Sequence, residues 1–203
     1  MARSSKVKAA ASEGPFKTGT FFTKIVHAED VLSVSAGYEN SAYRNQRLAE
    51  LLLNALPEFA LNLTELKAIS HLNMVDKLRE AALSVYESEK FKNRGEFGEL
   101  LLHVIMRDFF KTIPAVSKIY YKDSANNTVK GFDAVHVVET KTGLELWLGE
   151  TKFYSSISRA MADVAKDLES HTQARFLRNE FIYKILPVLF NSQGPEKRRH
   201  QQQ

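Results

Sequence analysis

Two apolar segments joined by a short polar turn constrain the fold of this chain more than any other feature. Residues 131–139 (GFDAVHVVE) and 144–154 (LELWLGETKFY) are rich in valine, leucine and aromatic residues, a composition typical of strands. The residues between them, 140–143 (TKTG), have the composition of a tight turn. We therefore predict an antiparallel hairpin in the second half of the chain.

The length of this turn decides which residues of the hairpin oppose one another. If Lys141 and Thr142 form the loop, counting outward from it places Asp133 opposite Glu150. Opposed residues share one face of a sheet, with Cβ atoms roughly 5 Å apart, and the period of two places Lys152 on that face as well. Two carboxylates so close repel each other, and a divalent cation or the Lys152 ammonium would relieve that repulsion.

A Glu-x-Lys triplet alone is weak evidence for a site, because the chain holds two others. One of them, 65–67, lies in a predicted helix, and the other, 139–141, straddles the turn. For the copy that begins at Glu150, the alternative is a solvent-facing strand with ordinary charges. Because the leucines of segment 144–148 share its face, the pattern instead predicts a partly buried site.

This arrangement resembles the active site of the PD-(D/E)xK nuclease superfamily, which holds magnesium between an Asp on one strand and an acidic-x-Lys on the next. That family adds a Glu from a preceding helix, where this chain has the segment 94–103 (RGEFGELLLH). Together with GFDAVHV, LWLGETKFY and the upstream 56–61 (LPEFAL), this segment resembles more narrowly the nuclease subunit of the Hachiman anti-phage defence system. The resemblance runs from residue 21 to residue 181. It implies an α/β fold with a restriction-endonuclease-like core, a central mixed sheet flanked by helices.

The resemblance also implies a role for each residue of the hairpin site. Asp133 and Glu150 would hold Mg²⁺, with Mn²⁺ as an alternative. Lys152 would stabilise the charge that develops on the phosphate and help to position the nucleophile. The carbonyl of Thr151, which lies between the two side chains, would be an extra metal ligand. We therefore expect phosphodiester hydrolysis at this end of the hairpin.

The helix acid has two candidates. The family pattern places it four residues after a glycine that Gly95 matches, so the resemblance implies Glu99, with Glu96 as the competitor. Some relatives use a helix histidine as a metal ligand, which makes His103 a further candidate, although a lone helix histidine is more often structural or exposed. Without the resemblance, the stripe that these residues form with Arg107 would be taken as a solvent-facing side of the helix.

The chain is predicted to have four parts, of which the two central ones contain strands and helices. These parts are a flexible arm (1–19), a small N-terminal α+β preface (20–90), the nuclease core (91–190) and a disordered basic tail (191–203). In the preface we expect one or two strands in 20–35 and helices at 42–56 and 66–86, separated near Pro57. In the core we expect a helix at 91–110, a short strand at 119–122, the hairpin, a long helix at 156–179 and an apolar segment at 182–190.

Composition says more about what the protein can bind than about the reaction it catalyses. No apolar run is long enough to span a bilayer and the first residues lack the apolar core of a secretory signal, so we expect a cytoplasmic protein with no membrane contact. Because the chain has no cysteine, a metal must be held by oxygen or imidazole. The net charge of +4 permits a nucleic-acid partner, and the chain carries no phosphate-binding loop of a nucleotide motor.

We therefore predict a Mg²⁺-dependent nuclease that acts on DNA, with a helicase as its partner because the resembling subunit works with one in Hachiman systems. One alternative is a noncatalytic adaptor that keeps the nuclease fold and binds DNA or the helicase. Against it, Asp133, Glu150 and Lys152 are all present. Another alternative is a restriction-type endonuclease that acts alone, which the lack of an evident sequence-reading module disfavours.

Overall fold

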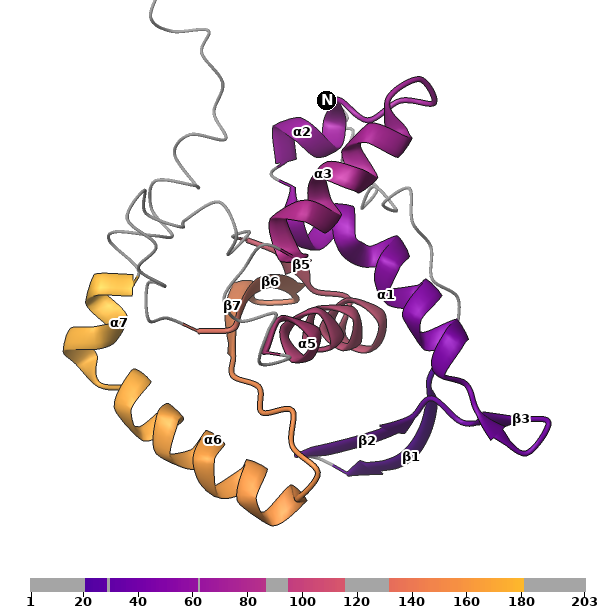
Figure 1. Ribbon diagram of the computed structural model, residues 1–203. Coiled ribbons are helices and arrows are strands. Elements are labelled where there is room, and N and C mark those ends of the chain that lie inside the picture. Colours follow the sequence, from indigo (N-terminus) through magenta and orange to yellow (C-terminus); the bar gives the residue numbers. More distant parts are fainter. Residues whose placement is uncertain (1–20, 29, 62, 87–94, 116–131, 181–203) are drawn as a thin grey trace, which may run out of the picture. The chain divides into compact units, whose positions relative to one another are not determined.

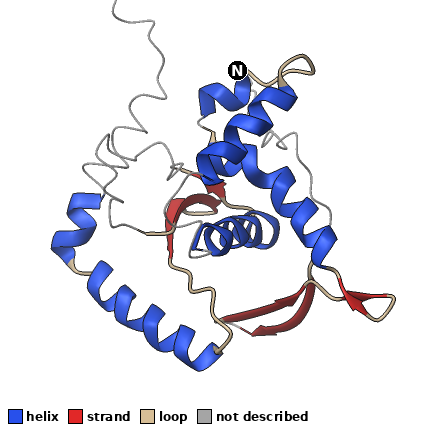
Figure 2. Cartoon of the chain, viewed as in Figure 1, coloured by secondary structure: helices blue, strands red, loops and turns tan. Residues whose placement is uncertain are grey.

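The computed structural model places strands and helices in a mixed α/β arrangement (Figures 1 and 2). It describes residues 21–28, 30–61, 63–86, 95–115 and 132–180. Small antiparallel sheets and six helices account for these residues. The chain divides into two compact units, one ending at Asn54 and the next beginning at Ala55, so the boundary falls inside helix α1 (Asn45–Ala60).

The first unit contains two short hairpins. The first pairs β1 (Thr23–Ala28) with β2 (Val31–Ser35), which confirms the strands predicted in this part of the chain. The second pairs β3 (Tyr38–Glu39) with β4 (Ala42–Tyr43). The two residues between β3 and β4 both have positive φ angles, 52° and 63°, as a two-residue turn of this kind requires.

Helix α1 is longer than the sequence pattern predicts. The predicted break near Pro57 is wrong, because Pro57 lies inside the helix and its carbonyl accepts a 2.9 Å hydrogen bond from the amide of Leu61. A proline in a helix interior removes one hydrogen bond and costs roughly 3 kcal/mol. The side chains that follow it, Phe59 and Ala60, are buried, and their burial offsets that cost.

The second predicted helix of the preface is two helices, α2 (Leu63–Lys67) and α3 (Met74–Tyr86). Asn73 explains the break. Its side-chain oxygen accepts a 2.7 Å hydrogen bond from the amide of Ser70, and its side-chain nitrogen donates to the carbonyl of Ala68 at 2.9 Å. These side-chain bonds compete with the helical pattern and turn the chain before α3 begins.

The second unit is built on a three-stranded antiparallel sheet in the order β5-β6-β7. The strands are β5 (Ile113–Pro114), β6 (Ala134–Thr140) and β7 (Gly143–Gly149). Thr140 opposes Gly143 and Ala134 opposes Gly149, so the register counted from the turn is confirmed. Both strands are shorter than predicted. The predicted strand at 119–122 and the apolar segment at 182–190 lie outside the described residues, and the mixed sheet of a restriction-endonuclease-like core stays a prediction.

Helix α5 (Gly95–Phe110) packs against the sheet (Figure 1), and a glycine lies at each of two close contacts. A Cβ at Gly149 would lie 3.0 Å from Leu102 of α5, and a Cβ at Gly98 would lie 3.3 Å from the Oγ1 atom of Thr151. Glycine at both positions therefore allows the helix to approach β7 and the residues that follow it closely. The helix begins where the described residues resume, within the predicted range 91–110.

The long helix predicted after the hairpin is also two helices, α6 (Ile157–His171) and α7 (Ala174–Glu180), which turn a corner in Figure 1. Ser156 caps the start of α6, where its hydroxyl accepts a hydrogen bond from the amide of Arg159. Thr172 ends it, because its amide and its hydroxyl both donate to the carbonyl of Leu168, at 2.8 and 2.6 Å. Of the helices described, none has the length and apolar character needed to cross a bilayer.

Candidate functional site

The two hairpin carboxylates lie where the regular strand pairing ends. The last opposed pair is Ala134 with Gly149, so Asp133 and Glu150 are the next residues on either side. The Oδ2 atom of Asp133 accepts a 3.0 Å hydrogen bond from the backbone amide of Thr151, across the end of the hairpin. This bond to a fixed backbone group holds the Asp133 carboxylate beside the Glu150 segment.

Glu150 is a buried carboxylate that is short of positive charge. Its side chain is only 6% exposed, and its Oε2 atom is buried without a hydrogen-bond partner. Burial raises the pKa of Glu150 and the charge of Asp133 raises it further, while Lys152 and His171 oppose the shift without cancelling it. A cation placed beside Glu150 would stabilise its charged form against burial and against the charge of Asp133, so the residues present fit a bound metal ion.

The ammonium group of Lys152 contacts two carboxylates. Its Nζ atom lies 3.1 Å from Oε1 of Glu150 and 2.5 Å from Oδ2 of Asp167. Burial lowers the pKa of Lys152, but the hydrogen bonds and charges of Asp167 and Glu150 outweigh burial and raise it above its ordinary value. The ammonium therefore stays protonated at neutral pH, which suits a group that stabilises negative charge.

Helix α6 contributes two residues to this site that the sequence reasoning missed. Asp167 pairs with Lys152, and His171, one helical turn further on, places its Nδ1 atom 3.5 Å from Oε2 of Glu150. An acid and a histidine four residues apart on an amphipathic helix directly after the Glu-x-Lys segment were the available signal. That spacing is common on solvated helices, so it could not distinguish a site from a surface.

The candidate helix residues are buried, so a solvent-facing stripe on α5 is ruled out. Glu96 and Glu99 are 5% and 4% exposed, and His103 is 2% exposed. Gly98, which lies between the two acids, packs on Thr151, so this turn of α5 adjoins the hairpin site. Both acids therefore remain candidates for the helix carboxylate, in a turn of the helix that the structure buries.

His103 belongs to a second group of polar residues, buried or half-buried, which we call the histidine cluster. Its members are Glu58, His103, Arg107, Thr112 and His136. Nδ1 of His103 lies 3.3 Å from Nε2 of His136, whose Nδ1 atom lies 2.7 Å from the hydroxyl of Thr112. Nε2 of His103 lies 3.6 Å from Glu58, to which Arg107 donates a 2.6 Å hydrogen bond. These contacts place His103 in the histidine cluster rather than beside Asp133 or Glu150.

The electrostatics of the histidine cluster differ from those of the hairpin site. Burial raises the pKa of Glu58, but the contacts with His103 and Arg107 outweigh it and lower the pKa to about 2. Burial and the charge of His103 lower the pKa of His136 to about 3. Glu58 is therefore ionised and compensated at neutral pH, while His136 is neutral.

The row of leucines that was expected to bury the site does so only at one end. Leu144 is 76% exposed and Leu146 is 39% exposed, whereas Leu148, next to the site, is half-buried. The expectation of an apolar row leading into the site is therefore wrong for its first part, because no described element covers the turn end of β7. The burial of Glu150 comes instead from α6 and from its neighbours in the hairpin.

Within the described residues, no group of three or more histidine and acidic side chains is arranged to hold a metal ion. Mg²⁺ commonly binds proteins through one or two carboxylates and takes its remaining ligands from water and substrate phosphates. Asp133 and Glu150 supply two carboxylates of the kind that this mode of binding uses.

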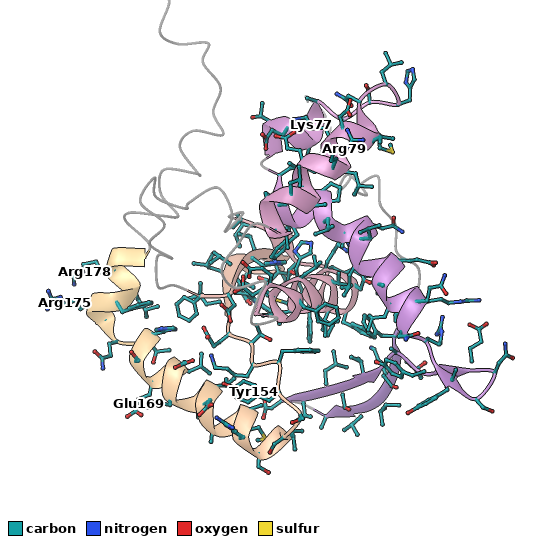
Figure 3. All side chains as sticks on the ribbon, viewed as in Figure 1. Lys77, Arg79, Tyr154, Glu169, Arg175 and Arg178 are labelled. Carbon is teal, nitrogen blue, oxygen red and sulfur yellow. The ribbon has the colours of Figure 1, made fainter. Side chains whose placement is uncertain are left out.

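Basic side chains lie on the helices that follow the site. Arg175 and Arg178 are exposed and extend outward from α7 (Figure 3). On α6, the guanidinium of Arg159 lies 5.5 Å from the ring centre of Tyr154, and Lys166 is exposed. These cations are available to phosphate groups.

A family model described as HamA matches residues 17–184, which is most of the chain. The matched range contains the hairpin site, helix α5 and helix α6. No curated protein and no solved structure matches this chain.

Proposed function

The chain belongs to the HamA family of the Hachiman anti-phage defence system, and we propose that it is the metal-dependent nuclease of that system, which hydrolyses phosphodiester bonds in DNA. The proposal assigns the chain to the PD-(D/E)xK type. It draws on the order of its three motif segments and on the geometry at the end of the β6–β7 hairpin.

The observation that carries the proposal is the buried Glu150 carboxylate. It lies next to Asp133, its side chain is only 6% exposed, and burial and the charge of Asp133 raise its pKa. A structural ion pair would compensate the charge of a buried acid, as the histidine cluster does for Glu58. A buried acid with a raised pKa, beside another acid and a lysine, is instead typical of a catalytic site that binds a cation.

Asp133, Glu150 and the carbonyl of Thr151 would hold Mg²⁺ or Mn²⁺ in this proposal. The ion, when bound, would neutralise a nonbridging phosphate oxygen and lower the pKa of a bound water. The chain's own contribution is orientation. The amide of Thr151 holds the Asp133 carboxylate, and Lys152 holds the Oε1 atom of Glu150.

Lys152 acts on the phosphate. Because its pKa is raised, its ammonium remains charged beside the carboxylates and can stabilise the charge that develops on the scissile phosphate. On α5, Glu99 is the preferred acid for orienting the attacking water or for bridging to the metal, and Glu96 is the alternative. Both acids are buried in the turn of the helix that adjoins Thr151.

DNA is the proposed substrate, and basic residues of α6 and α7 are the proposed contacts with its backbone. Exposed cations neutralise phosphates and release counterions, so binding through them weakens as salt rises. Lys166, Arg175 and Arg178 are exposed in the described part of the chain. Helices that follow the Glu-x-Lys segment thus place positive charge on the same unit as the site.

A helicase is the proposed partner, and it would restrain the nuclease until it engages DNA. The proposed docking surfaces are the N-terminal preface and the outer side of α6. Large apolar side chains are exposed on each, Ile25 and Val31 on the β1–β2 hairpin and Ile157 and Met161 on α6. Association of these surfaces with a partner would remove that apolar area from water.

The docking test uses point substitutions, because Glu58 and Phe59 of α1 contact His103 and a deletion through the preface would remove part of the core. Copurification with the neighbouring helicase at low salt should be weakened by Ile25→Ser with Val31→Ser. It should be retained by Glu150→Ala. If the intact chain fails to bind the helicase and cleaves fully alone, the free-standing endonuclease becomes the better description.

The nuclease test is cleavage of supercoiled plasmid by the purified chain, with and without the helicase, in Mg²⁺, in Mn²⁺ and in excess chelator. Wild-type protein should nick or linearise the plasmid only with metal, and Lys152→Ala should not. Arg79→Ala is a matched control, because Arg79 is an exposed cation on α3 that pairs with Asp76. Binding of DNA without cleavage under every condition would instead support the noncatalytic adaptor.

A further inference from the structure

His171 is the residue of the site that the motif pattern does not include. It ends α6, its side chain is 17% exposed, and its Nδ1 atom lies 3.5 Å from Oε2 of Glu150. Both of these atoms are buried without a hydrogen-bond partner. Two complementary polar atoms that face each other in a buried place form a contact that a small movement would close, since N–H···O bonds are roughly 2.7 to 3.2 Å long.

Aromatic rings hold the imidazole in this orientation. It stacks on Phe176 of α7, with ring centres 4.6 Å apart and planes at 12°. The edge of Phe132, at the start of the hairpin, meets it at 5.5 Å and 72°. These two contacts restrict the plane of the imidazole, and in that plane its Nδ1 atom faces Oε2 of Glu150.

The two oxygens of Glu150 thus face two different partners. Oε1 accepts a hydrogen bond from the ammonium of Lys152, and Oε2 faces the imidazole of His171. A carboxylate that is held at one oxygen can still rotate, whereas one that is held at both cannot. Supporting bonds of this kind commonly set the orientation of a ligating carboxylate in metal sites.

We propose that His171 is a positioning residue for Glu150: it donates its Nδ1 hydrogen to Oε2 and fixes the plane of the carboxylate that the reaction uses. The inference deepens the proposed nuclease function, on which it rests. His171 acts through Glu150 and touches neither substrate nor metal in this proposal. Asp167, one turn earlier on α6, holds Lys152, so a single helix orients both members of the Glu-x-Lys pair.

The first test reads the imidazole directly, by ¹⁵N NMR of the metal-free protein. A free neutral imidazole mostly carries its proton on Nε2, so a proton on Nδ1 reports an acceptor at that atom. We expect His171 to carry a proton on Nδ1 in the wild type and to lose that preference in Glu150→Leu. The exposed His71 is the internal reference. A bare Nδ1 atom on His171 in the wild type would overturn the inference, whether or not the protein is a nuclease.

The second test separates positioning from packing with two substitutions. His171→Phe keeps a ring that can stack on Phe176 but removes the donor, while His171→Asn loses the ring and keeps a donor near the position of Nδ1. If His171 positions Glu150, Phe should lower kcat by about 10- to 100-fold with KM nearly unchanged, and Asn should restore most of the rate. A purely structural role reverses this order.

The outcomes are distinguishable from failure of the nuclease proposal. If wild-type protein and Lys152→Ala are equally inactive in metal, with and without the helicase, the nuclease function fails, and the NMR result still decides whether His171 donates to Glu150. If the wild type cleaves and His171→Phe cleaves equally well, the positioning role is overturned. Should His171→Phe not fold, the rate of His171→Asn relative to a His171→Ala protein decides, because only a donor at this position restores activity.

Discussion

Two glutamates of the second unit are surrounded by protein, and their pKa values shift in opposite directions. Glu58, in the histidine cluster, is held by Arg107 and His103, and its pKa falls to about 2. Glu150, at the end of the hairpin, has Asp133 as a neighbour, and its pKa rises. The difference is one of charge balance rather than of burial, because burial raises the pKa of both.

This comparison distinguishes a carboxylate with a structural role from a carboxylate that is available to a ligand. A carboxylate whose charge is compensated within the chain contributes to stability at neutral pH and leaves little for a ligand to do. A carboxylate whose charge is not fully compensated within the chain lowers the stability of the fold. A cation that binds beside it restores that stability. The two glutamates should therefore respond in opposite ways to the same substitution.

The largest expected difference is in DNA cleavage. Glu150→Gln removes a charged oxygen ligand with little change in volume, and we expect cleavage in Mg²⁺ to fall by about a thousandfold or more. Glu58→Gln should keep cleavage within a few-fold of wild type at a temperature where it is folded. Initial rates on supercoiled plasmid measure both. Equal losses of cleavage rate in the two variants would contradict the proposed difference between the hairpin site and the histidine cluster.

The next difference is in stability without metal. Glu58→Gln leaves Arg107 and His103 without their shared carboxylate, so we expect a loss of about 3 kcal/mol in the free energy of unfolding. Glu150→Gln removes a charge that Asp133 repels, so its stability should equal or slightly exceed that of the wild type. Chemical denaturation in chelator measures both. Strong destabilisation by Glu150→Gln would show that its charge is structural.

The pH dependence of stability sharpens the comparison further. The pKa of His136 falls from 6.5 to about 3 on folding, so the unfolded chain binds this proton more tightly and stability drops as pH falls below 6.5. Glu58, with a pKa lowered from 4.5 to about 2, adds to this loss below pH 4.5. The raised pKa of Glu150 opposes both, because protonation in the folded state relieves its repulsion.

We expect each fully titrating group to change the unfolding free energy by about 1.4 kcal/mol per pH unit within its window. Thermal unfolding of the wild type from pH 8 to pH 4 should therefore show a falling midpoint below pH 6.5. In His136→Gln the part of the fall between pH 6.5 and 4.5 should be reduced. A wild-type midpoint that is constant over this range would contradict the buried, neutral state of His136.

The smallest expected effect is at Asp167. This residue is more exposed than the other members of the site, at 37% of its side chain, and Lys152 keeps its contact with Glu150 when Asp167 is changed. Asp167→Asn should therefore change the cleavage rate by only about two- to threefold, because an exposed ion pair contributes little. Single-turnover rates would measure the change. A loss as large as that of Lys152→Ala would place Asp167 among the essential residues.

The hairpin was predictable because its turn and its side-chain pattern act locally. A two-residue loop at Lys141 and Thr142 fixes the register, and the structure has that register. The site residues of the hairpin follow from the same count, although Glu150 and Lys152 lie beyond the last strand pair. Local turn chemistry and a period of two carry this information in the sequence.

The breaks within the helices and the contribution of α6 were not predictable. The hydrogen bonds of Asn73 and Thr172 that end helical segments depend on rotamers, which composition does not show. Helix α1 passes through Pro57 because the residues after it are buried, and burial depends on tertiary contacts. The same holds for His171, which reaches Glu150 only through the path of α6 after the hairpin.

The histidine cluster also affects the position of Asp133 relative to Glu150. His136 is on β6, three residues after Asp133, and its ring is tied to Thr112 on one side and to His103 of α5 on the other. A slip of β6 by one residue would turn the imidazole to the opposite face, so His136 would lose its contacts with both of these partners. The cluster therefore stabilises the observed register of β6. By disfavouring the slipped pairing, it keeps Asp133 and Glu150 together at the end of the β6–β7 pairing.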